Sequence, residues 1–375
     1  MKPYDVIIIG GGLAGLVSAL HLSKKKLSVA VIEKNAYPKH KVCGEYISNE
    51  VLPYLKSLDF DPIALKAKEI SNFIISSSKS NALETQLPLG GFGMSRYALD
   101  YELAKKAMAN GVSIFEEMVV DVQYENDGFY VQTKKNTYQS TIVLGAYGKR
   151  SNIDMKLKRA FTKKASPYLA VKAHYKGEFS PDLVGLHNFK GGYCGVSKVE
   201  NDHINICYIT SFKAFKAYKN IDDFQQHVLY ENKHLKTVLE NSTLVFEKPI
   251  TISQISFAVK TPVEQHILMM GDTAGMIHPL CGNGMAMGIR SAQIASELVV
   301  QFFSNEISSR ALLEQRYQKE WNREFKNRLR TGRQLASLFR MYRFSEIMLF
   351  TLKLFPKLLP FIIKKTHGKH MRAMQ

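Results

Sequence analysis

The sequence predicts an α/β fold that carries an α+β insertion, and three features predict it. An apolar run at residues 6–9 leads through glycines into a helical pattern and then into a second apolar run, which forms a βαβ unit. A strand, a glycine-rich loop and a long helix follow one another again from residue 267. Between these segments, residues 71–88 and 163–256 alternate apolar and polar side chains, as antiparallel strands do.

Composition places the chain among ordinary globular proteins. Hydrophobic residues make up 45% and charged residues 22% of the 375 positions, which excludes disordered, fibrous and disulfide-stapled classes. The length fits one large core with an inserted lobe as well as two or three separate units. The formal net charge of +18 predicts attraction to anions, such as cofactor phosphates, acidic lipids or nucleic acid.

The cysteines and the N-terminus bear on the compartment. Cys43, Cys194, Cys207 and Cys281 form no close CxxC pair, which argues against a metal site or a disulfide framework and for a reducing compartment. The first residues show no charged leader, apolar segment and small-residue cleavage site in succession. We therefore expect no metal and a cytoplasmic protein.

The N-terminal glycines have the spacing of a dinucleotide-binding turn. Gly10 permits the tight turn, Gly12 lets a pyrophosphate approach the backbone, and Gly15 lets the helix pack closely on the strand. The phosphates would face the helix N-terminus, and Glu33 at the end of the second strand can accept the ribose hydroxyls. The unit predicts a Rossmann-like dinucleotide site without deciding between NAD and FAD.

The second glycine-rich segment, HILMMGDTAGMIHPLCGNGM, favours FAD. Asp272 follows a short apolar strand and can accept hydrogen bonds from ribityl hydroxyls. Gly282 and Gly284 would present a helix N-terminus to the flavin ring or the pyrophosphate. The two segments together predict the two ends of one extended FAD site.

These motifs resemble those of the p-hydroxybenzoate hydroxylase-type flavoprotein superfamily: GxGxxG with Glu33, then SRYALDYELAKKA, then GDTAG with Pro279 and Gly284. Within it, KVCGEYIS and GDTAGMIHPLCGNGM look closest to the geranylgeranyl reductase branch. The resemblance implies that Cys43 and Gly44 lie near the isoalloxazine, Arg96 near the pyrophosphate and Val119 near the adenine. The predicted cofactor contacts are Gly10, Gly12, Ala14, Gly15, Glu33, Lys34, Cys43, Gly44, Arg96, Val119, Gly271, Asp272, Pro279, Gly282, Gly284 and Met285.

Three departures limit what the resemblance implies. Tyr147 stands where the superfamily usually has an acid. The substrate motif of the branch keeps Tyr193 and lacks its Trp, Phe and Pro, so the substrate is not inherited. Flavin halogenases carry a Trp-rich signature, whereas the single tryptophan here, Trp321, lies outside such a pattern, and we expect no halogenation.

We expect the two main domains to be discontinuous in sequence. The FAD-binding domain would comprise residues 1–70, 95–162 and 257–322, and the substrate domain residues 71–94 and 163–256, followed by a helical tail at 323–375. Residues 95–111 predict a capped helix that stops at Gly111, and Asn126-Asp127-Gly128 predicts a hairpin between strands at 119–122 and 129–132.

The tail combines positive charge with apolar side chains. Arg328, Arg330 and Arg333 precede the segment FSEIMLFTLKLFPKLLPFIIKK, in which lysines and two prolines interrupt the apolar run. The segment falls short of the roughly 20 apolar residues that a membrane span needs. Two interpretations stay open: the tail lies on an anionic membrane surface, or it packs on the core.

Three functions fit these features. In the first, reduced flavin delivers hydride to an alkene of a lipophilic, prenyl or polyketide-like substrate, with Cys43, Tyr193 or His278 as candidate proton donors and NAD(P)H as a transient reductant. The second is an aromatic or polyketide monooxygenase. The third, a nucleic-acid-binding flavoprotein, lacks a recognisable module, so we expect no nucleic-acid partner. We expect the protein to lie in the cytoplasm or at the inner face of the membrane.

Overall fold

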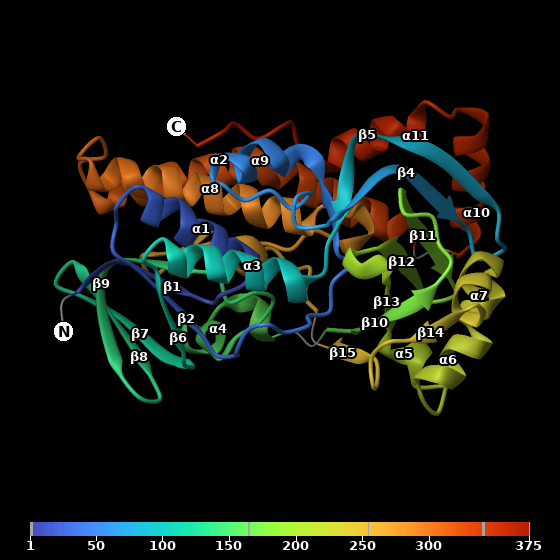
Figure 1. Cartoon of the computed structure of the whole chain (residues 1–375), viewed down its shortest axis with the longest axis horizontal. Helices are drawn as coiled ribbons and strands as arrows, with labels where there is room; N and C mark the ends of the chain where they lie inside the picture. The colour runs from blue at the N-terminus through green and yellow to red at the C-terminus, as the bar shows by residue number, and fades with distance from the viewer. Residues whose placement is uncertain (1–2, 164–165, 254, 340–341, 375) are drawn as a thin grey trace.

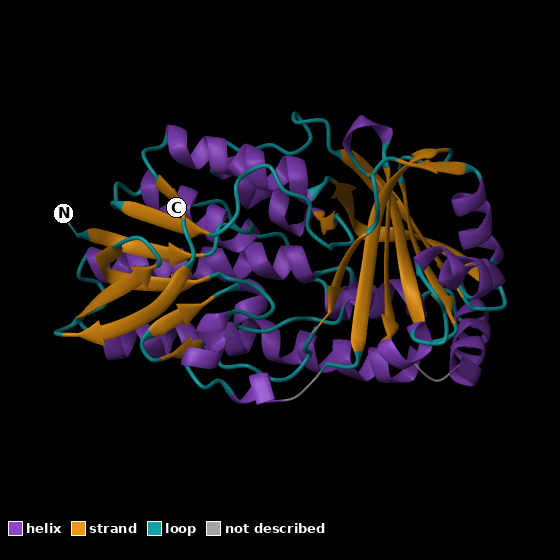
Figure 2. Ribbon diagram, turned by 90° about the horizontal axis from the view of Figure 1, so that it is seen from below, coloured by secondary structure: helices purple, strands orange, loops and turns teal. Residues whose placement is uncertain are grey.

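The computed structural model describes residues 3–163, 166–253, 255–339 and 342–374, and it contains two β-sheets at opposite ends of the molecule (Figure 1). Helices pack along both sheets and join them (Figure 2). We call the sheet that contains the N-terminal strand sheet A and the other sheet B. The mixed α/β architecture predicted from the sequence is confirmed.

Sheet A has a parallel centre. Its strand order is β16-β17-β9-β1-β2-β6, in which the successive pairs from β17 to β6 are parallel and β16 is antiparallel to β17. Its strands are β1 (Tyr4–Ile9), β2 (Val29–Glu33), β6 (Ser113–Glu116), β7 (Val119–Glu125), β8 (Gly128–Thr133), β9 (Thr137–Gly145), β16 (Val263–Glu264) and β17 (Ile267–Met269). All of them lie inside the ranges predicted for the FAD-binding domain.

Local sequence signals correctly predicted helix α3 and the hairpin between β7 and β8. Helix α3 (Arg96–Ala109) begins after Ser95, whose Oγ accepts a hydrogen bond from the Ala98 N–H at 3.0 Å. Just beyond its end, Gly111 has a φ of +83°. Asn126 and Asp127 both have positive φ between β7 and β8, as a two-residue hairpin turn requires.

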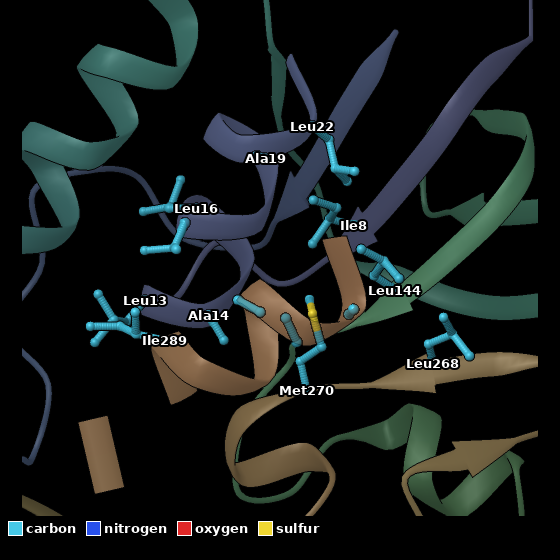
Figure 3. Close-up of a cluster of buried hydrophobic side chains, with 14 of the residues drawn as sticks. Ile8, Leu13, Ala14, Leu16, Ala19, Leu22, Leu144, Leu268, Met270 and Ile289 are labelled. Carbon is cyan, nitrogen blue, oxygen red and sulfur yellow. The ribbon is translucent and has the colours of Figure 1, made fainter. Parts of the chain in front are cut away.

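The main core lies between sheet A and helices α1 (Leu13–Lys24) and α8 (Gly284–Phe303). Every residue of α1 from Leu13 to Leu22 is buried, because the sheet, α3 and α8 surround the helix. Figure 3 shows Ile8 of β1 close to Leu22 of α1, with Leu144 of β9 on the other side of Ile8. Full burial of one such side chain contributes about 1.5–3 kcal/mol.

Sheet B forms the second lobe. Its order is β14-β10-β13-β12-β11-β4-β5-β3, with β15 beside β10. Its strands are β3 (Tyr46–Ser48), β4 (Lys68–Ser76), β5 (Ala82–Gly93), β10 (Tyr168–Gly177), β11 (Leu183–Phe189), β12 (Gly192–Lys198), β13 (Ile204–Ser211), β14 (Ser242–Leu244) and β15 (Ile250–Ser253).

Three details of this lobe differ from the prediction. The pair of β4 and β11 is parallel, whereas the sequence predicted an antiparallel sheet. Strand β3 lies within the range 1–70 but pairs with β5 of sheet B. Short helices cover the outer face of the sheet, where the prediction had strands alone: α5 (Phe212–Phe215), α6 (Ile221–His227) and α7 (Lys233–Glu240). Helices of four to eight residues are too short to show a clear helical period in a sequence.

The tail consists of α9 (Arg310–Phe339), α10 (Tyr342–Leu354) and α11 (Leu358–Thr366). Tyr317, Trp321 and Phe325, spaced four residues apart on α9, are buried in the main core. Helices α10 and α11 lie next to sheet B (Figure 1). We expected Pro360 to break a helix, but it does not. It lies in the first turn of α11, where a backbone N–H has no intrahelical partner, so the missing N–H costs no hydrogen bond.

Two shorter helices complete the fold, α2 (Leu52–Ser57) and α4 (Asn152–Lys156). In the part of the chain that the structure describes, no helix is both long enough and apolar enough to cross a membrane.

Candidate functional site

The turn between β1 and α1 is shaped by close backbone contacts. Gly10 has a φ of +104°, and a Cβ at Gly15 would lie 2.1 Å from the carbonyl oxygen of Gly10. Neither position therefore accepts a side chain without a backbone shift. Gly12 is the N-cap of α1 and makes no side-chain cap, so the first N–H groups of the helix face outward unblocked. This is the geometry that binds a phosphate.

Glu33 ends β2 beside this turn, as the sequence predicted. Its Oε2 accepts a hydrogen bond from the Gly11 N–H at 2.9 Å, and its Oε1 accepts from Asn35 Nδ2 at 2.8 Å. The next residue, Lys34, is exposed. Tyr37 was missed by the sequence analysis, and its hydroxyl donates to the Gly11 carbonyl at 2.5 Å. Glu33 and Tyr37 thus fix both polar groups of Gly11.

Two cations lie over the N-terminus of α1. Arg96 Nη2 is 3.5 Å, and Lys41 Nζ 3.9 Å, from the point where a Cβ at Gly12 would be. Asp100 holds both cations, because it accepts from Arg96 Nε at 2.7 Å and from Lys41 Nζ at 2.8 Å. Burial disfavours the Arg96 charge, but the adjacent Asp100 carboxylate raises the pKa of Arg96 above its ordinary value.

The position of Arg96 supports its predicted role at the pyrophosphate. Lys41 and Asp100 were not assigned a role from the sequence, although Lys41 begins the segment KVCGEYIS. A helix N-terminus with two fixed cations beside it fits the two negative charges of a pyrophosphate. The residues present at this end therefore fit FAD. Val119 is buried at the start of β7, a separate strand of the same sheet.

The distal loop lies against the N-terminal turn. The Cβ of Ala14 is 3.3 Å from the point where a Cβ at Gly271 would be, and 4.0 Å from the same point at Gly288. Gly148 N–H donates to Thr273 Oγ1 at 2.8 Å, which ties the loop to the end of β9. The structure thus brings together the two glycine-rich segments that the sequence assigned to one site.

Asp272 lies half-buried in a 3₁₀ turn, Gly271–Thr273. Lys260 Nζ donates to its backbone carbonyl at 2.7 Å and to that of Lys149 at 3.0 Å. Burial lowers the pKa of Lys260 to about 8. Lys260 was missed from the sequence, and it fixes the loop through the backbone carbonyl of Asp272 and not through the carboxylate.

The rest of the loop leads into α8. Pro279 begins a second 3₁₀ turn, and Gly282, with a φ of +62°, ends it one residue before the N-cap of α8. Helix α8 then begins at Gly284. The sulfur of Met285 is 3.5 Å from that of Cys43. The Cys43-Gly44 turn and the start of α8 are therefore neighbours, as expected for residues around one flavin ring.

Sheet B holds the Cys43-Gly44 turn from the other side. Asn205 Nδ2 on β13 donates to the Gly44 carbonyl at 2.8 Å and to the Cys43 carbonyl at 3.3 Å. A Cβ at Gly44 would meet no heavy atom within 4 Å, so the turn borders open space. Asn205 was missed, because nothing in an alternating strand pattern marks one amide as functional.

A buried charged cluster lies next to this turn. Glu45 accepts from Lys172 Nζ at 2.5 Å, is 2.7 Å from His174 Nε2, and also accepts from the Arg96 N–H at 2.7 Å. The Glu45 and Lys172 side chains have no exposed surface. Burial tends to raise the pKa of Glu45, but Lys172 and His174 hold it below its ordinary value. Glu45 thereby connects sheet B to the start of α3.

Two of the three candidate proton donors share a cavity. Tyr193 Oη on β12 is 3.3 Å from His278 Nδ1 in the distal loop, and both line a cavity of about 230 Å³. Burial, followed by the nearby thiols of Cys281 and Cys207, raises the pKa of Tyr193 well above its ordinary value. Cys43 does not line this cavity. The structure therefore separates Cys43 from the pair of Tyr193 and His278.

The cavity has a mixed lining, and two of its lining residues, Tyr193 and Ile209, belong to a buried apolar cluster. The inner face of sheet B, the distal loop and the tail form one buried cluster: Ile75, Ala170, Leu186, Tyr193, Ile209, Ile255, Met276, Leu349, Leu352 and Leu359. Trp321 lies elsewhere, with its ring 2.9 Å from the point where a Cβ at Gly275 would be. The tryptophan fills space behind the loop. Within the described residues, no group of three or more His, Cys, Asp or Glu side chains is arranged to hold a metal.

Known proteins share these features. A family model described as FAD dependent oxidoreductase matches residues 5–44. A digeranylgeranylglycerophospholipid reductase of Methanopyrus kandleri is 24% identical over 377 residues, which cover 92% of this chain and 93% of that protein. The N-terminal fingerprint and the full-length similarity agree with the site built from the residues.

Solved structures show the same fold. A geranylgeranyl bacteriochlorophyll reductase-like protein from Thermoplasma acidophilum has a TM-score of 0.70 at 19% identity and covers 91% of this chain and 88% of its own. A flavin-dependent brominase has a TM-score of 0.79 at 18% identity, with 97% and 94% covered. Since these two proteins are named for different reactions, the fold does not decide the reaction.

Proposed function

The chain belongs to the FAD-dependent oxidoreductase superfamily, near the geranylgeranyl reductase branch, and from that premise we propose that it reduces carbon–carbon double bonds of a lipophilic substrate. The observation that carries the proposal is the cavity of Tyr193 and His278, which joins the distal loop to an apolar cluster of sheet B and the tail. Phe189, Ile209 and Leu280 in the lining suit a prenyl or polyketide-like chain, and the polar side chains beside them could orient it.

The polar residues at the turn would hold the cofactor. Arg96 and Lys41 would bind the pyrophosphate, Glu33 the adenosine ribose and Asp272 the ribityl chain. Bound there, reduced FAD would supply the hydride for one carbon of the double bond. We propose that NAD(P)H binds transiently as the reductant, since the sequence has one GxGxxG fingerprint and FAD would occupy it.

The second carbon of the double bond needs a proton. Tyr193 is the donor that we propose, because its hydroxyl lines the cavity and His278 Nδ1 lies 3.3 Å from its oxygen, within reach to replace the proton. Cys43, which lies outside the cavity, would shape the opposite side of the flavin pocket.

Mass spectrometry of the product tests the reaction. The purified holoenzyme, reduced under nitrogen, is mixed with a geranylgeranyl lipid and then analysed. A gain of two hydrogens per reacted double bond supports the proposal. A gain of one oxygen, seen only in air, contradicts it and identifies a monooxygenase. Tyr193→Phe is expected to reduce the rate by about 10²–10⁴-fold with unchanged flavin content.

We also propose that the tail binds the surface of an anionic membrane. Four large apolar side chains of the tail are more than half exposed although the opposite side of the same helices is buried: Ile347, Phe350, Leu354 and Phe361. Phe355, between the helices, is 63% exposed. Lys353 and Lys357 lie among them and can meet anionic headgroups. A membrane at this face would give a lipid substrate a short route to the cavity.

Vesicle sedimentation tests this contact. The holoenzyme is expected to bind vesicles of equal parts phosphatidylglycerol and phosphatidylcholine, and Phe350→Ser with Phe361→Ser is expected to bind at least about tenfold more weakly. Met108→Ser with Met155→Ser is the control, because these methionines are also about half exposed and lie on α3 and α4. Equal loss in both variants would contradict the proposal.

A further inference from the structure

A second cavity, lined by none of the predicted site residues, lies between sheet B, α8, α9 and the C-terminal segment. Its volume is about 830 Å³. The wall of strand β5 contributes Leu87, Pro88 and Leu89, and α11 contributes Ile363. Tyr46 also lines it, and the ring of Tyr46 is 3.4 Å from the point where a Cβ at Gly282 would be. One side chain thus separates this cavity from the distal loop.

The lining is strongly cationic. Six arginine or lysine side chains face two carboxylates, Glu50 and Glu324, and the six come from α8, α9, α11 and the segment after α11: Arg290, Arg323, Arg328, Lys364, Lys369 and Arg372. Lys364 and Lys369 form no ion pair within the described part of the chain. Charges gathered from four separate segments repel one another unless an anion lies between them.

The two carboxylates are already engaged. Glu50 is buried, accepts from the Gly368 N–H at 2.5 Å and from Asn283 Nδ2 at 3.2 Å. Glu324 pairs with Arg328 and lies 3.7 Å from Arg290. These bonds orient the acids toward the protein, so they neutralise only part of the positive charge in the cavity.

Two buried nitrogens in the lining lack a hydrogen-bond partner in the described structure. One is Arg328 Nη1, whose nearest carboxylate oxygen, on Glu50, is 3.6 Å away. The other is His367 Nε2, which is an acceptor in the neutral ring because Nδ1 donates to the Ile363 carbonyl at 2.9 Å. Buried polar atoms are normally hydrogen-bonded, so the unmet donor of Arg328 beside surplus positive charge points to an anionic ligand.

From these observations we propose that this cavity binds the phosphate of an anionic lipid headgroup. A phosphate accepts several charge-assisted hydrogen bonds from guanidinium and ammonium groups, and the apolar wall of β5 and α11 would contact the attached hydrocarbon. The lipid source is favoured over a dinucleotide because α11, which carries Lys364, also carries the exposed Phe361 of the membrane-binding face. That the bound lipid is the substrate of the enzyme rests on the proposed function.

Calorimetric titration of the holoenzyme with dihexanoylphosphatidylglycerol, kept below its micelle concentration, tests the site. We expect saturable binding that Lys364→Glu with Lys369→Glu weakens at least about tenfold, since two attractive charges become repulsive. The control is Lys134→Glu with Lys135→Glu, an equal change of charge on exposed residues at the far hairpin, which should alter the affinity less than about twofold. Equal weakening in both variants overturns the site.

Two further arms identify the source of the phosphate. Dihexanoylphosphatidylcholine, which has no net charge, should bind more weakly than the glycerol lipid, and NADPH should not displace the lipid. The lipid assignment would be overturned if NADPH displaced the lipid from the wild-type protein but not from the variant with Lys364→Glu and Lys369→Glu. If the protein did not bind the lipid but still reduced a neutral prenyl alcohol at the normal rate, the lipid site would be refuted and the proposed reaction would stand. Normal lipid binding without any reduction would refute the reaction alone.

Discussion

The two sides of the cofactor site are built in different ways. On the side of sheet A, backbone groups and missing side chains of residues a few positions apart shape the turn, and Arg96 and Lys41 lie over it. On the side of sheet B, the charged side chains of Lys172 and His174 reach Glu45 across 127 and 129 positions of sequence. The turn of the first side depends mainly on local backbone geometry. On the second side, changing one charged residue leaves a buried charge without its partner.

The strongest test of this contrast removes Lys172. Lys172→Met leaves the buried Glu45 carboxylate short of a cationic partner, which is expected to cost about 3–5 kcal/mol of the free energy of unfolding. Urea denaturation measures the loss. Lys176→Met, on the exposed end of the same strand, should cost less than about 0.5 kcal/mol.

A second variant separates charge from packing. Glu45→Gln with Lys172→Met removes both charges and should regain a large part of the lost stability, because the carboxylate no longer lies unpaired. If Lys172→Met by itself changed the free energy of unfolding by less than about 1 kcal/mol, the contrast between the two sides would not hold.

The sheet A side contains a buried titratable group of a different kind. His21 on α1 is 2.7 Å from the Tyr54 hydroxyl, and burial lowers its pKa to about 4. The unfolded chain, with a pKa near 6.5, binds this proton more readily, so stability falls as pH drops from about 6.5 to 4. The loss amounts to about 3 kcal/mol. Urea denaturation at a series of pH values should show it in wild type.

His21→Gln should remove this part of the pH dependence, since glutamine can still pair with Tyr54 but does not titrate. His227 is exposed on α6, and His227→Gln should retain the wild-type pH profile. A profile for His21→Gln that follows wild type down to pH 4 would show that the acid sensitivity arises elsewhere.

The smallest effect is expected at Asp272. Asp272→Ala should weaken FAD binding by about 10–100-fold, the value of one hydrogen bond to a charged acceptor, and change the free energy of unfolding of the apoprotein by less than about 0.5 kcal/mol. Flavin fluorescence titration measures the affinity. Glu125→Ala, an exposed acid on β7, is the matched control. A normal flavin affinity in Asp272→Ala would remove this residue from the proposed site.

The parts of the site that the sequence predicted are local ones. The glycine turn, Glu33 after β2, the cap of α3 and the Asn126-Asp127 hairpin each depend on a few consecutive residues. The missed parts depend on contacts between distant segments: Lys41 with Asp100, Asn205 with the Cys43-Gly44 turn, and Glu45 with Lys172. A lysine or an asparagine in a strand looks the same in sequence whether it faces water or a buried carboxylate, so only the fold could reveal these partners.

The contact of Ala14 with Gly271 and Gly288 bears on how the protein is made. Residue 14 leaves the ribosome early, while its partners follow more than 250 positions later. The central strands β1 and β9 likewise wait for β17 to complete their sheet. A newly made chain therefore cannot complete the two-segment site around residue 14 until residues 271–288 have been synthesised.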